Sequence, residues 1–386
     1  MSSNLIFKSF NFKLKKKNKK TLQQYLDKIV KTNDPKFIAS FKTNFDYDYD
    51  SKLLKKYKIF KHINIIGMGG SSLGTKAIYN FLKHKIKKKV TFFENINFKK
   101  KYKSKKLNII VSKSGNTLET IANLNTQINT IDKNIFITEN SSNYLRKLAY
   151  KLKSEVIEHK NFIGGRFSVL SEVGMLPAQL MGLNEHKFKK FNDLVSKKTF
   201  LNNLFHNTLS TYQLIKLKKF NSIILNYDKN SDDLFKWYQQ LVSESLGKNS
   251  KGILPVISTM PKDNHSILQL YLSGFNSNFF TFYIVEEKNS AYLNSKLIFD
   301  NFDFLRGKNV FNILNSQRIA TQNIFRRKNI PFRSFYIKKR NEETMGELFS
   351  FFTLEVILLS KLLKINPLNQ PEVELVKKET FNILRR

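Results

Sequence analysis

The stretch H-I-N-I-I-G-M-G-G-S-S-L-G at 62–74 decides the fold class of this chain. An isoleucine-rich run passes directly into a glycine-rich turn, and a helix-like segment follows at 72–84. A strand, a tight turn and a helix in this order form the unit from which parallel sheets are built. Backbone N–H groups at such a helix start favour a bound anion. The stretch therefore predicts a parallel α/β protein with a phosphate-binding loop.

The same alternation of strands and helices continues along both halves of the chain. In the first half, the further expected strands are V-T-F-F at 90–93, L-N-I-I-V at 107–111 and N-I-F-I-T at 134–138. In the second half, they are N-S-I-I-L at 221–225, a run at 253–257, F-F-T-F-Y-I-V at 279–285 and P-F-R-S-F-Y-I at 331–337. We therefore expect two lobes, each a parallel sheet with helices on both faces.

Four parts are expected along the chain. They are an N-terminal helical or irregular extension at 1–50, a first domain at 51–198, a second at 199–343 and C-terminal helices at 344–386. The last part begins with a strongly apolar segment of helical spacing, so we expect it to pack against the second domain.

Composition limits the class of protein. A chain of 386 residues is long enough for two hydrophobic cores, and 41% of its residues are hydrophobic. It has no apolar run long enough to span a bilayer, which predicts a soluble, cytoplasmic protein. The absence of cysteine excludes disulfides, thiolate metal sites and a cysteine nucleophile.

The formal net charge of +37 raises the alternative of a nucleic-acid-binding protein. The excess is mostly lysine spread along the whole chain, and lysine lacks the bidentate geometry with which arginine reads bases. We therefore expect no nucleic-acid partner. A positive field would still draw an anionic substrate toward a cleft.

A second polar loop, S-K-S-G-N-T-L-E-T at 112–120, follows the expected strand at 107–111. Ser112, Ser114, Asn116 and Thr117 crowd one strand-to-helix junction. Thr117 or Asn116 is expected to cap the helix, and capping accounts for only one or two of the four. The others are available to bind phosphate oxygens. For the first loop, a dinucleotide site is the main alternative, with Glu94 after the expected strand at 90–93 as its ribose-binding acidic residue. Ser72, however, stands where G-x-G-x-x-G needs its third glycine.

Six islands of sequence together resemble the phosphoglucose isomerase family. They are I-G-M-G-G-S-S-L-G at 66–74, S-K-S-G-N-T-L-E-T at 112–120, G-G-R-F-S at 164–168, Q-L-V-S-E-S-L-G-K at 240–248, N-H-S-I-L-Q-L at 264–270 and Q-P-E-V-E-L-V-K at 370–377. This resemblance implies two sugar isomerase (SIS) lobes of three layers, αβα, with flavodoxin-like, doubly wound parallel sheets, followed by C-terminal helices. It also implies interconversion of glucose 6-phosphate and fructose 6-phosphate.

The same resemblance assigns the site residues. Glu244 would be the base that moves the proton, Arg166 would stabilise the enediolate, and His265 and Lys377 would open the sugar ring. The substrate and its phosphate would be bound by Gly70, Ser71, Ser72, Ser112, Lys113, Ser114, Gly115, Asn116, Thr117, Gln240 and Gln370. The family works without metal or cofactor as a homodimer, and His265 would enter the site from the partner chain.

Some positions depart from the family pattern. Pro371 follows Gln370, Val376 stands where a glycine is expected, and Asn116 stands where threonine is common. Asn116 is shared with bifunctional enzymes that also accept mannose 6-phosphate, so that activity stays open. A phosphosugar sensor without catalysis is a further alternative, but it would have no need to keep Glu244 and Arg166 together.

Overall fold

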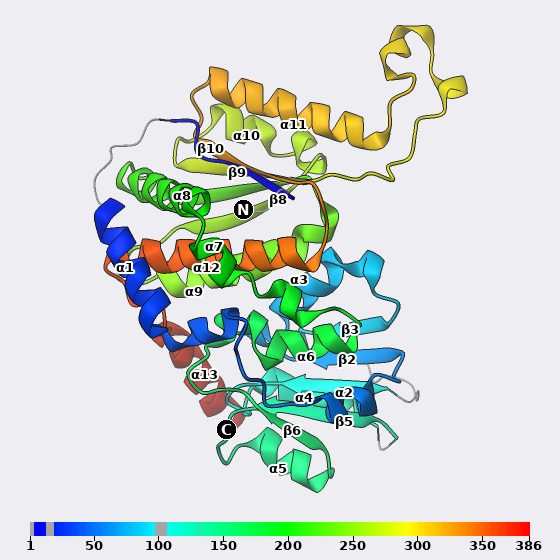
Figure 1. Cartoon of the computed structure of the whole chain (residues 1–386), viewed down its shortest axis with the longest axis vertical. Coiled ribbons are helices and arrows are strands. Elements are labelled where there is room, and N and C mark those ends of the chain that lie inside the picture. Colours follow the sequence, from blue (N-terminus) through cyan, green and yellow to red (C-terminus); the bar gives the residue numbers. More distant parts are fainter. Residues whose placement is uncertain (1–3, 13–18, 97–105, 130) are drawn as a thin grey trace.

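The computed structural model describes residues 4–12, 19–96, 106–129 and 131–386. These residues form two five-stranded sheets, one above the other in Figure 1, with helices between them and on their outer faces. The inner faces of the two sheets share one continuous hydrophobic core. The two lobes are therefore packed against each other through this shared core.

The first sheet is entirely parallel, in the order β3-β2-β4-β5-β6. Its strands are β2 (His62–Ile66), β3 (Lys89–Phe93), β4 (Leu107–Val111), β5 (Lys133–Thr138) and β6 (Glu155–Glu158). Its helices are α2 (Ser51–Tyr57), α3 (Leu73–Phe81), α4 (Leu118–Gln127), α5 (Tyr144–Lys151) and α6 (Glu172–Leu180). Helices α4 and α5 cover the outer face, where Ile66, Ile110 and Phe136 meet Leu124 and Leu145. Helices α3 and α6 cover the inner face.

The second sheet has the order β1-β10-β9-β7-β8. Its strands are β1 (Leu5–Lys8), β7 (Asn221–Asn226), β8 (Leu254–Thr259), β9 (Asn278–Val285) and β10 (Phe332–Ile337). All eight residues of β9 are buried, and they alternate between two cores: Phe280 and Phe282 face α10 and α11, whereas Phe279 and Tyr283 face the inner helices. Burial on both faces is typical of a parallel strand covered by helices on each side.

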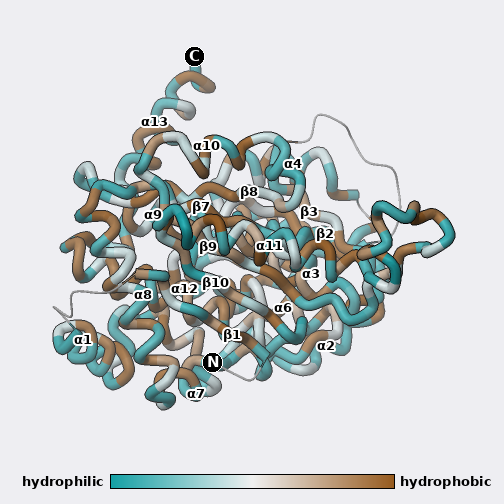
Figure 2. Tube along the Cα trace, turned by 90° about the horizontal axis from the view of Figure 1, so that it is seen from above, coloured by the Kyte–Doolittle hydropathy of each residue, from teal (hydrophilic) through white to brown (hydrophobic). Residues whose placement is uncertain are grey.

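The helices of this lobe form the layers on its two faces. They are α7 (Phe191–Val195), α8 (Lys198–Lys216), α9 (Asp232–Leu246), α10 (Leu268–Ser273), α11 (Val310–Arg327) and α12 (Glu342–Leu363), whereas α13 (Pro371–Leu384) lies outside these layers. Nearly every side chain of α12 is buried, because this helix lies between the two sheets and contacts α8 and α9. A largely apolar helix that is buried on all sides belongs in such a central position. Helix α13 has no buried side chain and projects from the body in Figure 2.

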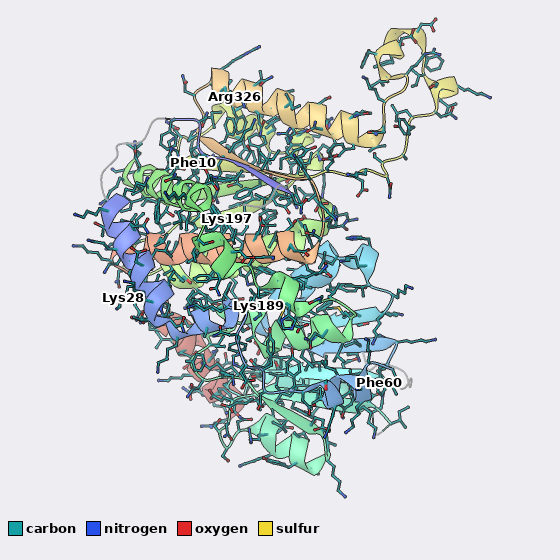
Figure 3. The ribbon with its side chains drawn as sticks, viewed as in Figure 1. Phe10, Lys28, Phe60, Lys189, Lys197 and Arg326 are labelled. Carbon is teal, nitrogen blue, oxygen red and sulfur yellow. The ribbon has the colours of Figure 1, made fainter. Side chains whose placement is uncertain are left out.

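The N-terminal segment, expected to be helical or irregular, contains one strand besides its helices. Strand β1 pairs antiparallel with β10, so the second sheet is not purely parallel. Phe10, labelled in Figure 3, continues this contact, since its ring lies 6.0 Å from that of Phe279. Helix α1 (Lys19–Thr32) then packs on α8 and α12. No local sequence pattern predicts β1, because this four-residue edge strand pairs with a strand from the far end of the chain.

The predicted fold class is confirmed: two αβα lobes with parallel sheets, followed by C-terminal helices. The four domain boundaries stay a prediction.

Candidate active site

Two loops end neighbouring strands of the first sheet. Gly67 follows β2, and a Cβ atom there would lie 2.8 Å from the carbonyl oxygen of Val111, the last residue of β4. The loop after β2 forms a short 3-10 helix, Gly69–Ser71, and the loop after β4 is the polar stretch 112–117. Because both strands are parallel, both loops open at the same edge of the sheet, where α/β proteins bind their ligands.

Glycine allows the first loop to approach two other segments. A Cβ atom at Gly70 would lie 2.2 Å from the carbonyl carbon of Gly165, so the loop touches the backbone that carries Arg166. Gly69 has φ of +54°, and a Cβ atom there would lie 2.9 Å from Nε2 of Gln240 on α9. The loop therefore joins the first lobe to the helix that carries Glu244.

The two serines of this loop differ in accessibility. Ser71 is half-buried. Ser72 is fully buried, and its hydroxyl donates to the carbonyl oxygen of Gly69 at 3.4 Å. Of these two serines, both predicted to bind phosphate, only Ser71 is therefore accessible in this structure.

The second loop brings its hydroxyl groups together. Oγ of Ser112 and Oγ1 of Thr117 lie 2.8 Å apart. Ser112 is buried at this position. Thr117 is the N-cap residue of α4, but its side chain makes no capping bond, and its hydroxyl is directed to Ser112. Gly115 has φ of +66° and packs on Asn143, whose side chain fills the place of a Cβ atom.

The remaining residues of this loop point in other directions. Asn116 is exposed and its Oδ1 accepts from the backbone N–H of Tyr144, the first residue of α5. The sequence predicted Asn116 or Thr117 as the side-chain cap of α4, and neither provides it. Ser114 is exposed. Lys113 donates to the carbonyl oxygen of Asn161 at 2.6 Å, and burial lowers its pKa against the opposing effect of Glu139.

Arg166 lies at the centre of the site on the 3-10 helix Gly165–Leu170. It is only 3% exposed. Its Nε donates to the hydroxyl of Ser245 at 3.0 Å, and its Nη1 donates to Oε2 of Glu244 at 2.9 Å. Burial lowers the pKa of the Arg166 guanidinium, and the Glu244 carboxylate partly offsets this, but arginine remains charged under ordinary conditions. A permanent cation is thus fixed beside the candidate base.

The turn between α12 and α13 supplies the other partners of Arg166. Nη1 also donates to Oε1 of Gln370 at 2.5 Å, and Nη2 donates to the carbonyl oxygens of Pro367 at 2.6 Å and Asn369 at 3.3 Å. The structure therefore brings Gln370 to Arg166 across 204 positions of sequence.

Glu244 lies one turn after Gln240 on α9, and the two side chains share a face of the helix. Nε2 of Gln240 donates to Oε1 of Glu244 at 2.9 Å, while Arg166 binds the other oxygen. The Glu244 side chain is 24% exposed, in contrast to that of Arg166. The carboxylate is held from two sides and still reaches solvent, as a group that exchanges a proton with a bound substrate must do.

Two predicted residues lie apart from this cluster. His265 is exposed on the 3-10 helix Lys262–His265, which follows β8 in the second lobe. Lys377 is exposed on α13 and pairs with Glu374 at 2.7 Å. In the described part of the chain, no hydrogen bond or ion pair joins either residue to Arg166 or Glu244. Their roles stay predictions, as do those of the other site residues.

Sequence reasoning assigned no role to Ser245 and Lys248, although both belong to the Q-x-x-x-E-S-x-G-K motif. Ser245 binds Arg166, and Lys248 lies close enough to Arg166 and Glu244 for both to affect its pKa. Glu94, the acidic residue of the dinucleotide alternative, forms an ion pair with Lys76 instead.

A family model described as phosphoglucose isomerase matches residues 50–260, more than half of the chain. The chain belongs to the phosphoglucose isomerase family. This confirms the resemblance that the six islands indicate, and it makes the chain an isomerase. The matched residues include both loops, Arg166, Gln240 and Glu244.

Relatives in this family cover most of the chain. A glucose-6-phosphate isomerase of Methanocaldococcus jannaschii is 30% identical over 88% of this chain and 89% of its own length. One from Mycoplasmopsis synoviae is 33% identical over 83% of this chain and 81% of its own length.

Solved structures show the same fold. A hypothetical protein from Thermus thermophilus matches 95% of the chain and 94% of its own, with a TM-score of 0.79 and 22% identity. A glucose-6-phosphate isomerase from Chlamydia trachomatis matches 86% of the chain and 72% of its own, with a TM-score of 0.68 and 19% identity.

Two kinds of feature are absent from the described residues. Within 4–12, 19–96, 106–129 and 131–386, no helix is long and apolar enough to cross a membrane. The same ranges contain no group of three or more His, Asp or Glu side chains placed to hold a metal ion.

Proposed function

We propose that the chain interconverts glucose 6-phosphate and fructose 6-phosphate through a cis-enediol intermediate. The observation that carries the proposal is the position of Glu244, whose two carboxylate oxygens are held by Gln240 and by the buried Arg166 while the side chain stays partly exposed. A fixed carboxylate beside a fixed cation is suited to removing a proton next to a carbonyl and stabilising the enediolate that forms.

The proton and the charges balance in this scheme. With the ring open, Glu244 takes the proton from C2 of the aldose, the carbonyl oxygen at C1 becomes an enediol oxygen, and Arg166 stabilises the negative charge that develops. Transfer of a hydroxyl proton from O2 to O1 and return of the proton by Glu244 to C1 then give the ketose. The loop at 112–117, together with Ser71, would bind the phosphate, and His265 and Lys377 would open the ring.

The decisive test follows glucose 6-phosphate formed from fructose 6-phosphate through a coupled dehydrogenase, with EDTA present. Turnover that depends on Glu244 is expected. No turnover together with tight binding of sugar phosphate would instead favour a sensor. Initial rates on mannose 6-phosphate decide whether the enzyme is bifunctional. Asn116 raises that alternative, but Gln240 and the signature at 370–377 favour the glucose enzyme, so we expect selectivity for glucose 6-phosphate.

We also propose that the chain forms a homodimer in which His265 completes the partner's site. In support, His265 is exposed, and the segment 286–309 between β9 and α11 extends far from the body (Figure 1). Leu297 and Phe299 on this arm are 77% and 80% exposed. Exposed apolar side chains on a protruding segment are typical of subunit contacts.

A cytoplasmic location stays a prediction.

Mixing two inactive variants tests this arrangement. If Glu244→Gln and His265→Gln subunits are unfolded and refolded together, mixed dimers contain one site with both native residues and one with neither. Random assortment then restores about a quarter of the native activity. If His265 acts within its own chain, every site in the mixed dimer lacks one residue and no activity returns.

A further inference from the structure

The turn between α12 and α13 is held by cationic side chains that bind its main-chain carbonyls. Nη2 of Arg166 binds two of these carbonyls, and Nζ of Lys248 donates to a third, that of Asn366, at 2.6 Å. Just before the turn, Nζ of Lys251 donates to the carbonyl oxygen of Leu363 in α12 at 3.1 Å. Ile365, directly after α12, is buried in the main core, and α13 has no buried side chain, so Arg166 and Lys248 are the side chains that hold the turn at 366–370 on the site.

Lys248 links this turn to the helix that carries the candidate base. It lies just after the C-terminal end of α9, and its Nζ also donates to the carbonyl oxygen of Ser245 at 3.3 Å. A cation at a helix C-terminus binds unpaired carbonyls favourably. Ser245 in turn binds Nε of Arg166, so Lys248 and Arg166 share both the end of α9 and the turn.

We propose that Lys248 is a positioning residue that keeps the turn seated on Arg166. By holding Asn366 against the end of α9, it fixes Gln370 and the guanidinium beside Glu244 in the geometry that isomerisation needs. The proposal rests on the proposed isomerase function. It adds a role for a lysine that contacts neither Glu244 nor Gln370 by a hydrogen bond in the described residues.

The electrostatic surroundings of Lys248 agree with this role. The pKa of Lys248 is lowered to about 8, first by burial and then by the positive charge of Arg166, while the Glu244 carboxylate opposes both effects. The backbone of Lys251 pairs with that of Lys248 in a short antiparallel bridge. The turn presents only carbonyl oxygens to the Lys248 ammonium. As pH rises above about 8, Lys248 loses its charge and binds the carbonyls less strongly.

The experiment compares Lys248→Met and Lys248→Arg with Lys251→Met as the matched control. Hydrogen–deuterium exchange of the full-length protein without substrate reports how tightly residues 366–370 are held. In Lys248→Met, we expect faster exchange of this turn and a fall in kcat of about tenfold or more, with a smaller change in KM. Lys248→Arg should restore both and move the alkaline fall of kcat/KM to higher pH. Lys251→Met should change neither, because its lysine binds the end of the buried helix α12.

Other results would overturn the proposal. Native exchange of the turn in Lys248→Met, native kinetics despite faster exchange, or an arginine variant as impaired as the methionine variant would each exclude a positioning role. Failure of the proposed function is recognised separately, because then the native protein itself would not turn over fructose 6-phosphate.

Discussion

Nη1 of Arg166 lies 2.9 Å from Oε2 of Glu244, although the two residues are 78 positions apart in the sequence. Arg166 comes from the first lobe and Glu244 from the helix after β7 of the second sheet. The pair therefore forms only where the two lobes meet, and its geometry depends on how the first loop, α9 and the C-terminal turn pack around it.

Replacing the candidate base should abolish turnover without unfolding the protein. In Glu244→Gln the side chain keeps its size, but it cannot accept the substrate proton as a carboxylate does. Loss of a general base costs about 10²–10⁴-fold. We expect that fall in kcat in the coupled assay, with an unfolding midpoint near that of the native protein. A variant that retains more than half of the native turnover would remove Glu244 from the mechanism.

Replacing Arg166 by lysine should impair both catalysis and stability. A lysine ammonium cannot reach Ser245, Glu244 and the turn at once, since its donors all lie on one atom. We expect kcat to fall about 10²-fold, as for loss of one preorganised donor. The matched control is Arg340→Lys, which also weakens an arginine–carboxylate ion pair, here the two-bond pair with Asp228. That variant should lose stability and keep most of its kcat; equal falls in kcat would indicate a general effect.

The contact between the first loop and the Arg166 segment should depend on the absence of a side chain at Gly70 and not at Gly165. In Gly70→Ala the new Cβ meets the Gly165 carbonyl carbon at 2.2 Å, which forces the two backbones apart. We expect about 1–3 kcal/mol of lost stability and at least about tenfold lower kcat/KM, since overpacking moves the backbone beside Arg166. In Gly165→Ala the nearest atom lies 3.7 Å away, so this variant should behave like the native protein. Urea unfolding and kinetics measure both effects, and equal behaviour of the two variants would contradict the prediction.

The buried His159 should make the protein sensitive to acid. It is 1% exposed, and its pKa is lowered to about 4, mainly by burial and to a smaller extent by the positive charge of Lys113. Between this value and the ordinary value of 6.5, the unfolded chain binds more protons than the folded one, so stability falls as pH falls through this window. The contribution of this one group between neutral pH and pH of about 4.5 is about 2 kcal/mol.

Urea unfolding at both pH values tests the role of His159. His159→Gln should flatten the acid decline by that amount, whereas the same substitution at the exposed His186 should leave the decline unchanged. An unaltered decline in His159→Gln would mean that other groups cause the acid sensitivity.

The sequence by itself determined the local units of this protein. The isoleucine-rich run before Gly67 and the polar loop after Val111 specify strand, turn and helix through contacts between near neighbours. The motif that places Gln240 four residues before Glu244 also fixes their common face, because helix periodicity alone decides it. Fold class and family follow from such short patterns.

Only the tertiary structure decided which of these units meet. Strand β1 has no signal of its own, since its partner β10 is more than 300 residues away. The bonds of Arg166 to Gln370 and of Lys248 to Asn366 join segments 204 and 118 positions apart, and nothing local in either segment specifies the other. The local sequence around Asn116 predicts a helix cap or a phosphate ligand. The packing of α5 against the loop instead makes its Oδ1 the acceptor of the backbone N–H of Tyr144. Long-range contacts of this kind depend on the packing of the whole core, which pairs residues by position in space and not by spacing along the chain.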